Sequence, residues 1–109
     1  MNEHFARLSP EGEPERCLPA EWQDWLSDPA YNPYLARERF DKWKIDLVFS
    51  GFWIGEGAPK FYSVSVNPPL GCGDLWQFEC YQDALEAHGR VLAACRRESE
   101  REAALVDGA

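Results

Sequence analysis

The chain has 109 residues, of which 45% are hydrophobic and 14% aromatic, and its formal net charge at pH 7 is −8. This length and apolar content suffice for one domain with its own core, which excludes wholesale disorder. No stretch of the chain clusters Lys and Arg, so the charge also argues against direct binding to a nucleic-acid backbone.

The first part of the sequence is strongly acidic. Residues 1–28 carry seven acids and two bases, whereas residues 29–97 carry eight of each. Within residues 1–17, Pro10, Gly12 and Pro14 stand among charged residues with few large apolar groups. Such a segment buries too little surface to offset the entropy of ordering it. We therefore predict a flexible acidic arm over residues 1–17, which would steer encounter with a positively charged partner or simply keep the protein soluble.

Two short helices are predicted next. Pro19 suits the first turn of a helix, where its missing N–H costs nothing, and Asp28-Pro29 ends this element. The large apolar residues between them share one face of the helix: Trp22, Trp25 and Leu26. Asn32-Pro33 repeats the start signal, which predicts two further helical turns over Tyr34–Phe40.

From Trp43 the hydrophobic period changes to two, which is typical of strands with one buried face. The first predicted strand covers residues 43–49, and Gly51 after it indicates a bulge or a sharp bend. A second strand is predicted over residues 61–66, a longer loop over residues 67–74, and a third strand over residues 75–80.

The last element is a long amphipathic helix. Its apolar residues recur at helical spacing over four turns: Tyr81, Ala84, Leu85, His88, Val91, Leu92 and Cys95. The predicted fold is α+β, with a three-stranded antiparallel meander, this C-terminal helix packed on one face, and short N-terminal helices. We expect a single domain over residues 18–97 and a frayed acidic tail over residues 98–109, which carry four acids and one base.

Residues that could carry catalysis are few, and we predict no catalytic residue. His88 could pair with Cys80 or Cys95 as a thiol–imidazole couple, but Cys95 lies two helical turns away, too far for direct proton transfer. A lone histidine on an apolar stripe is more often part of the core. Three acids could converge at a sheet edge as a carboxylate pair or metal site, but their spacing makes no signature and acids on the polar face of a strand are ordinarily solvated: Asp46, Glu79 and Asp83.

The cysteines and the hydropathy of the chain indicate where in the cell the protein is located. No signal peptide and no apolar run long enough to span a bilayer is visible, so we expect a cytoplasmic protein. The spacing of the four cysteines fits no closed zinc site, and we expect reduced thiols, no metal and no cofactor. These cysteines are Cys17, Cys72, Cys80 and Cys95.

The aromatic residues exceed what one small sheet–helix interface holds. Large aromatics left at a surface favour a protein interface, where Trp and Tyr dominate binding energy. The candidates for such a protein-binding surface are Trp22, Trp25, Tyr31, Tyr34, Phe52 and Phe61. Alternatively, residues 18–40 wrap the second face of the sheet and bury all of them.

The junction between the last strand and the last helix has the pattern Trp76-x-Phe78-x-x-Tyr81-x-Asp83-Ala84-Leu85-x-x-His88. Placed after a meander, this pattern resembles the strand-to-helix junction of small, uncharacterised phage and prophage proteins, with Cys80 where such junctions commonly have Ser or Thr. The resemblance implies a phage origin. Small acidic proteins of that origin are often inhibitors of host machinery, including anti-CRISPR-like and other anti-defence proteins. Because that class has no shared site, the resemblance assigns no functional residues.

The leading hypothesis is a small cytoplasmic inhibitor that occludes a larger, basic protein complex, such as a nucleic-acid-handling defence system. It would contact neither nucleic acid nor membrane directly. The alternative is an immunity protein that neutralises a cognate bacterial toxin, a function that needs the same acidic charge and surface aromatic residues. An enzyme or ligand-binding domain is a distant third hypothesis. A spare aromatic sheet face would also allow a homodimer.

Overall fold

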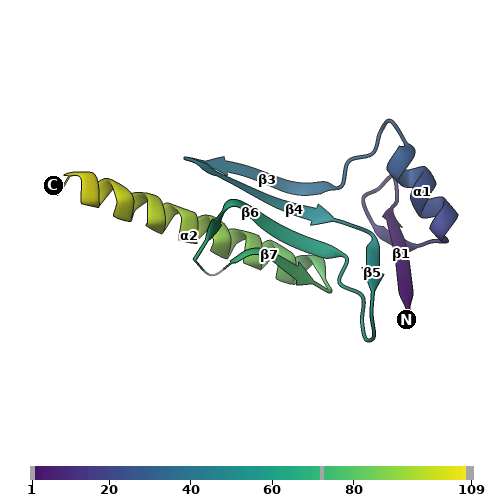
Figure 1. Cartoon of the computed structure of the whole chain (residues 1–109). Coiled ribbons are helices and arrows are strands. Elements are labelled where there is room, and N and C mark those ends of the chain that lie inside the picture. The colour runs from purple at the N-terminus through teal and green to yellow at the C-terminus, as the bar shows by residue number, and fades with distance from the viewer. Residues whose placement is uncertain (1, 72, 108–109) are drawn as a thin grey trace.

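The computed structural model describes residues 2–71 and 73–107, so Cys72 lies outside the described residues. Within these ranges the fold is α+β, as predicted, but it has seven strands in two antiparallel sheets rather than one three-stranded meander (Figure 1). The larger sheet has the order β3-β4-β6-β7 and the smaller one the order β2-β1-β5. The elements are β1 (Glu3–Leu8), β2 (Pro14–Arg16), α1 (Pro19–Ser27), β3 (Tyr34–Phe40), β4 (Trp43–Phe49), β5 (Phe52–Ile54), β6 (Tyr62–Leu70), β7 (Gly73–Phe78) and α2 (Tyr81–Asp107).

The main core lies between α2 and one face of the four-stranded sheet. The alternation predicted in β4 is confirmed, and its inward residues are fully buried or nearly so: Trp43, Ile45, Leu47 and Phe49. The register sets Val64 of β6 opposite Leu47, which continues the apolar face across the sheet. From α2 the buried residues share one helical face: Ala84, His88, Val91 and Cys95. Tyr81 and Leu85, predicted on the same stripe, remain exposed at its margin.

The helix predicted over Tyr34–Phe40 is wrong, because this segment is strand β3. The Asn32 side chain does accept a hydrogen bond from the backbone N–H of Tyr34, at 3.2 Å, but it shapes a turn rather than a helix start. The Pro33 carbonyl then accepts the N–H of Phe49 at 2.9 Å, and β3 pairs antiparallel with β4 from there to the Phe40–Trp43 pair. Completing the edge of β4 therefore overrides the local helix propensity of the segment.

Ser50 and Gly51 carry the chain from one sheet into the other, which confirms the bend predicted at Gly51. Gly51 has φ +70°, and a Cβ at this position would lie 2.1 Å from the carbonyl oxygen of Ala6. The N–H of Ala6 donates to the Gly51 carbonyl at 2.9 Å, and the indole N–H of Trp22 donates to the Ser50 carbonyl at 3.3 Å. A residue without a side chain thus lets β1 approach the bend closely.

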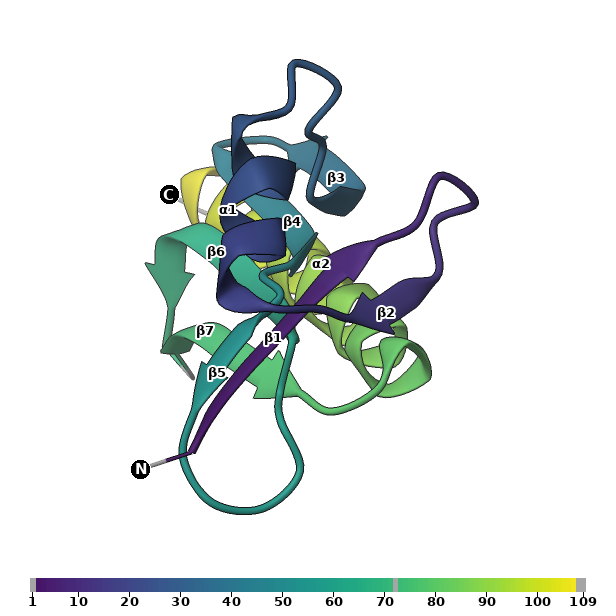
Figure 2. The same ribbon diagram turned by 90° about the vertical axis from the view of Figure 1, so that its right-hand side faces the viewer.

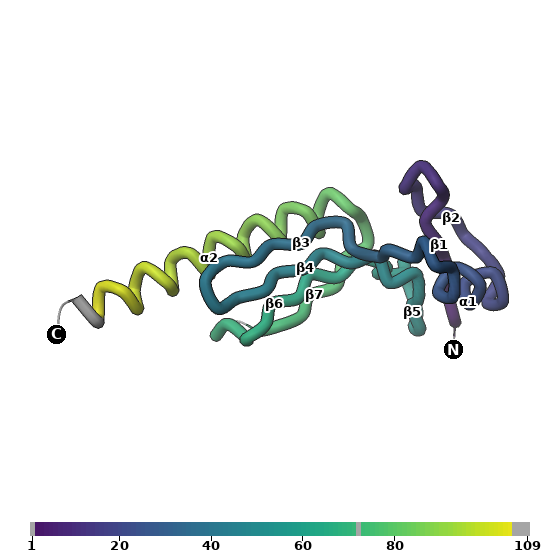
Figure 3. The backbone as a smooth tube through the Cα atoms, turned by 90° about the horizontal axis from the view of Figure 1, so that it is seen from above, coloured from purple at the N-terminus to yellow at the C-terminus, as the bar shows by residue number. Residues whose placement is uncertain are grey.

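The flexible arm predicted over residues 1–17 is also wrong, since this segment forms the hairpin of β1 and β2. β1 pairs with β2 on one side and with β5 on the other, so it is the central strand of the smaller sheet. Ala6 in β1 is 1% exposed, and α1 packs against the same strand. Residues 2–28 together with β5 are called the N-terminal lobe below; it lies at one end of the molecule (Figures 1 and 3).

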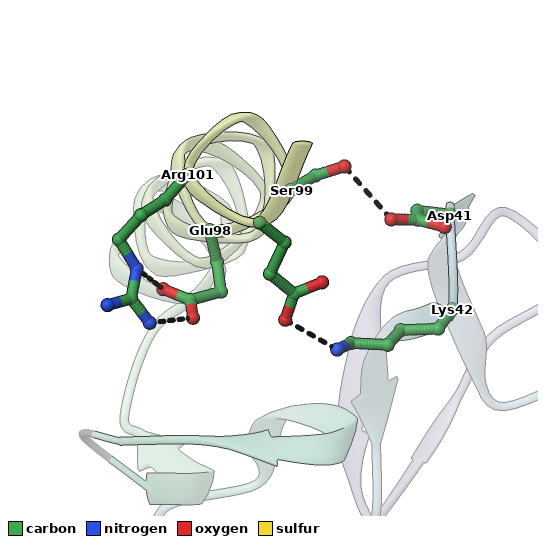
Figure 4. Close-up of polar contacts among 6 residues, drawn as sticks. Asp41, Lys42, Glu98, Ser99 and Arg101 are labelled. Atoms are coloured by element: carbon green, nitrogen blue, oxygen red, sulfur yellow. Dashed lines mark hydrogen bonds and ion pairs between the residues drawn. The ribbon is translucent and has the colours of Figure 1, made fainter. Parts of the chain in front are cut away.

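The tail predicted to fray over residues 98–109 is helical as far as Asp107, while the last two residues lie outside the described residues. Two contacts attach this part of α2 to the β3–β4 turn (Figure 4): Lys42 Nζ donates to Glu102 at 2.7 Å, and Ser99 Oγ donates to Asp41 at 2.9 Å. On α2 itself, Arg101 pairs with Glu98 one turn earlier.

The second face of the four-stranded sheet is not wrapped by residues 18–40. α1 packs on β1 beyond the end of this sheet, and residues 34–40 are themselves a strand within it (Figure 3). Polar side chains therefore remain on this face, where Arg37 of β3 hydrogen-bonds Asp46 of β4 at 3.3 Å. β6 extends to Leu70 and β7 starts at Gly73, so the loop predicted over residues 67–74 is much shorter.

In the described part of the chain, neither helix has the length and hydropathy that crossing a membrane requires.

Candidate functional site

A groove of about 630 Å³ lies between the β1–β2 hairpin and the C-terminal end of α1, and it is called the α1 groove below. Figure 2 faces this lobe, with α1, β1 and β2 toward the viewer. The hairpin contributes Arg7 and Glu15, α1 contributes Asp24 and Trp25, and the segment after α1 contributes Asp28 and Tyr31 among others. Its volume lies in the range of sites that bind small molecules or peptide side chains.

One wall of the α1 groove is aromatic. The rings of Trp25 and Tyr31 meet edge to face, with centroids 4.8 Å apart, and Trp25 also meets the buried ring of Phe49 at 6.1 Å. This contact anchors the wall to the main core, so its geometry is fixed before any ligand binds. Burial raises the pKa of the Tyr31 phenol, so Tyr31 faces the groove as a neutral group at physiological pH.

The charges around the groove are predominantly negative. Arg7 is the cation at its edge, and its guanidinium is held by Glu15 at 2.9 Å and by Glu21 at 3.6 Å. The hydrogen bond that Arg7 Nε donates to the Glu15 carboxylate is the main cause that raises the pKa of Arg7. Asp24 and Asp28 form no ion pair with any described residue. The groove therefore presents two carboxylates without a cationic partner beside a neutral aromatic wall.

The six aromatic candidates do not form one surface. Trp25 and Tyr31 line the α1 groove, whereas Trp22 and Phe52 pack with Phe5 inside the N-terminal lobe, with ring centroids 5.2–5.5 Å apart. Phe61 is 7% exposed and packs on Phe49, so it belongs to the core rather than to a surface. Tyr34 is 39% exposed and is covered by the guanidinium of Arg37, 3.9 Å from its ring centroid.

The remaining chemical candidates lie elsewhere and apart. His88 is 6% exposed in the main core, and its Nε2 has no hydrogen-bond partner among the described residues. Asp46 pairs with Arg37, on a different element from Glu79 and Asp83, and the described part of the chain holds no cluster of three metal-ligating side chains. Cys80 is an exposed thiol, and burial raises the pKa of the half-buried Cys17 thiol.

Sequence reasoning missed the acidic side of the groove. Asp28 was treated only as part of the signal that ends the helix, Asp24 was not considered, and residues 1–17 were treated as a separate arm, so nothing brought Arg7 and Glu15 next to these acids. One signal was available in the sequence. Acids occupy the C-terminal end of a short helix that has no basic residue in its last turn, which opposes the preference set by the helix dipole.

Comparisons with models of known protein families, with curated proteins and with solved structures find no match. Two carboxylates without a cationic partner among the described residues, beside an aromatic wall, suit binding of a cationic group.

Proposed function

We propose that this protein is a small binding protein that inhibits a basic, nucleic-acid-handling protein complex by occluding its surface. One observation carries the proposal: the seven acids of residues 1–28 belong to a folded lobe, in or next to β1, β2 and α1, rather than to a loose arm. An acidic surface of fixed shape competes with a nucleic-acid backbone for the same basic residues.

The affinity for a basic partner depends on whether these acids are held in a folded structure. Carboxylates on a flexible arm would steer an encounter but would lose conformational entropy when bound. Here the spacing of the acids is set by the pairing of Arg7 with Glu15 across the hairpin, and by α1. Residues 1–28 carry a net charge of −5, residues 29–97 carry eight acids and eight bases, and residues 98–109 carry the remaining −3. The N-terminal lobe is therefore the part that favours a basic partner.

The first test is affinity capture from bacterial lysate with the tagged protein, at low and at moderate salt, read by mass spectrometry. The test variant carries Glu3→Gln, Glu11→Gln and Glu13→Gln, which remove three exposed charges that form no ion pair with a described residue. The control variant carries Glu79→Gln, Asp83→Asn and Glu86→Gln, which remove three exposed charges at the β7–α2 end of the molecule.

We expect a stoichiometric, basic, nucleic-acid-handling partner that the control variant retains and the test variant loses as salt rises. Purified protein should then displace nucleic acid from that partner in an electrophoretic shift assay. A partner captured equally by both variants, or a partner that still binds nucleic acid at saturating inhibitor, would contradict the proposal. Capture of a bacterial toxin whose activity is blocked would replace it with the immunity-protein hypothesis.

A further inference from the structure

We infer that the α1 groove receives an arginine side chain from an extended segment of a partner protein. This inference deepens the proposed function and rests on it for the identity of the partner, but the groove has its own chemistry and can be tested alone. It starts from the cavity itself: about 630 Å³, walled by Trp25 and Tyr31 on one side and bordered by the hairpin residues Leu8 and Pro10 on the other.

The C-terminal end of α1 carries acidic residues, where the helix dipole favours basic ones. The carbonyl end of a helix carries a partial negative charge and is stabilised by cations. α1 has no basic residue in its last turn, and instead Asp24 lies in that turn and Asp28 at the C-cap. Neither carboxylate has a cationic partner among the described residues. A cation placed in the groove would complement both carboxylates and the helix end together.

The aromatic wall selects the kind of cation. A planar guanidinium stacks on indole and phenol rings and donates several N–H groups in one plane, whereas an ammonium is more strongly hydrated and is a point donor. The same molecule already shows this type of contact, because Arg37 lies over the Tyr34 ring at 3.9 Å. Arginine therefore fits the groove better than lysine, and its charge complements Asp24 and Asp28.

The size of the groove favours a peptide segment over a free amino acid. The lining extends from Arg7 and Glu15 on the hairpin to Asn32 after α1, so backbone groups on either side of the bound side chain also meet the walls. Leu8 and Pro10 supply apolar surface for such a segment. The partner chemistry is thus a basic, arginine-bearing strand or loop.

The test is an NMR titration of the full-length, isotope-labelled protein with the capped tripeptide Ala-Arg-Ala. Matched probes replace arginine by citrulline, which has nearly the same shape and no charge, or by lysine. We expect saturable chemical-shift changes at the backbone amides of residues 7–9, 24–28 and 30–32 with the arginine probe, a weaker response with lysine and none with citrulline. Equal shifts with citrulline, or shifts confined to other residues, would overturn the inference.

The variant for this test is Asp24→Asn with Asp28→Asn. Asp28 accepts the N–H of Ala30 at 2.8 Å, and asparagine keeps that acceptor, so the fold and the thermal midpoint should be retained. Affinity for the arginine probe should fall about tenfold, because two charge-assisted contacts are removed. The matched control, Asp74→Asn with Asp83→Asn, removes two exposed carboxylates outside the lobe and should bind like the wild type. A double Asp24/Asp28 variant that binds with unchanged affinity would refute the site.

The two proposals fail separately. If the arginine probe binds but no basic partner is captured, the groove is real and the inhibitor proposal is wrong. If a basic partner is captured and the Asp24/Asp28 variant captures it equally well, the inhibitor proposal stands and the groove is not the point of contact.

Discussion

Gly51 is the residue on which the two-sheet architecture depends. It combines φ +70° with a position where a Cβ would lie 2.1 Å from the carbonyl oxygen of Ala6. The substitution Gly51→Ala therefore adds backbone strain and forces β1 away from the bend. We expect it to lower the free energy of unfolding by about 3 kcal/mol, measured by urea denaturation.

Gly57 provides the matched control for this prediction. Its φ of +86° is also left-handed, but a Cβ there would meet nothing within 4 Å. Gly57→Ala should therefore cost only the strain of a left-handed alanine, about 1 kcal/mol. Equal losses for the two variants would show that the close approach of β1 to the bend does not exist.

The buried Tyr62 and the partly buried Tyr31 make the stability of the fold depend on alkaline pH. Burial is the first cause that raises the pKa of both Tyr31 and Tyr62. The folded state therefore favours the neutral phenol, and its stability is intact below the ordinary tyrosine pKa of about 10 and falls as pH rises through the higher folded pKa. Tyr62→Phe should flatten part of that fall in urea denaturation between pH 8 and pH 11. A stability that is as steep in Tyr62→Phe as in the wild type would contradict this assignment.

At the scale of elements, the N-terminal hairpin is structural. Its strand β1 is the centre of the smaller sheet, Ala6 is buried, and Phe5 packs on both Trp22 and Phe52. Deleting residues 2–17 should therefore lower the free energy of unfolding by more than about 3 kcal/mol, because an entire layer of the lobe loses its partner.

Truncation after Arg96 is the counterpart at the other end of the chain. It removes the contacts of Ser99 and Glu102 with the β3–β4 turn, which are exposed polar pairs. Such pairs contribute little, so the loss should stay below about 1 kcal/mol. Thermal and urea unfolding of both truncated proteins measure these two losses of stability. A deletion of residues 2–17 that unfolds at the same temperature as the wild type would support the interpretation of residues 1–17 as a flexible arm.

Prediction from sequence succeeded where one face of an element is buried along its whole length. The alternating residues of β4 and the apolar face of α2 could be predicted because in both elements the spacing of the apolar residues matches the spacing of the buried positions. It failed for β1 and β3, whose sequences are charged and lack a clear period. These strands form because β5 and β4 offer unpaired backbone edges, and that information lies in distant segments.

The candidate site was predictable in part for the same reason. Trp25 and Tyr31 were identified as aromatics in excess of the core, and they line the groove. The carboxylates of Asp24 and Asp28 were not identified, because their importance depends on the hairpin folding back beside α1. The two aromatic residues could be identified from their residue type. That they lie beside the two acids could not be predicted without knowing that the smaller sheet forms.

At the scale of the whole molecule, the two ends have different roles. The α2 end holds the main core, and the N-terminal lobe carries most of the net charge together with the α1 groove (Figure 1). This separation lets the lobe vary in charge without disturbing the main core. Both proposals depend on one claim, namely that the acids of residues 1–28 belong to an ordered lobe.

Amide hydrogen exchange of the free protein, followed by NMR, tests this claim most directly. The N–H of Ala6 donates to Gly51 and the N–H of Cys17 donates to Phe5, whereas Glu11 lies at the exposed hairpin tip. We predict slow exchange for Ala6 and Cys17, comparable to that of Phe49 at the end of β4 in the larger sheet, and fast exchange for Glu11. Fast exchange at Ala6 and Cys17 while Phe49 stays protected would show that the acids are carried by a loose arm, and would contradict the account.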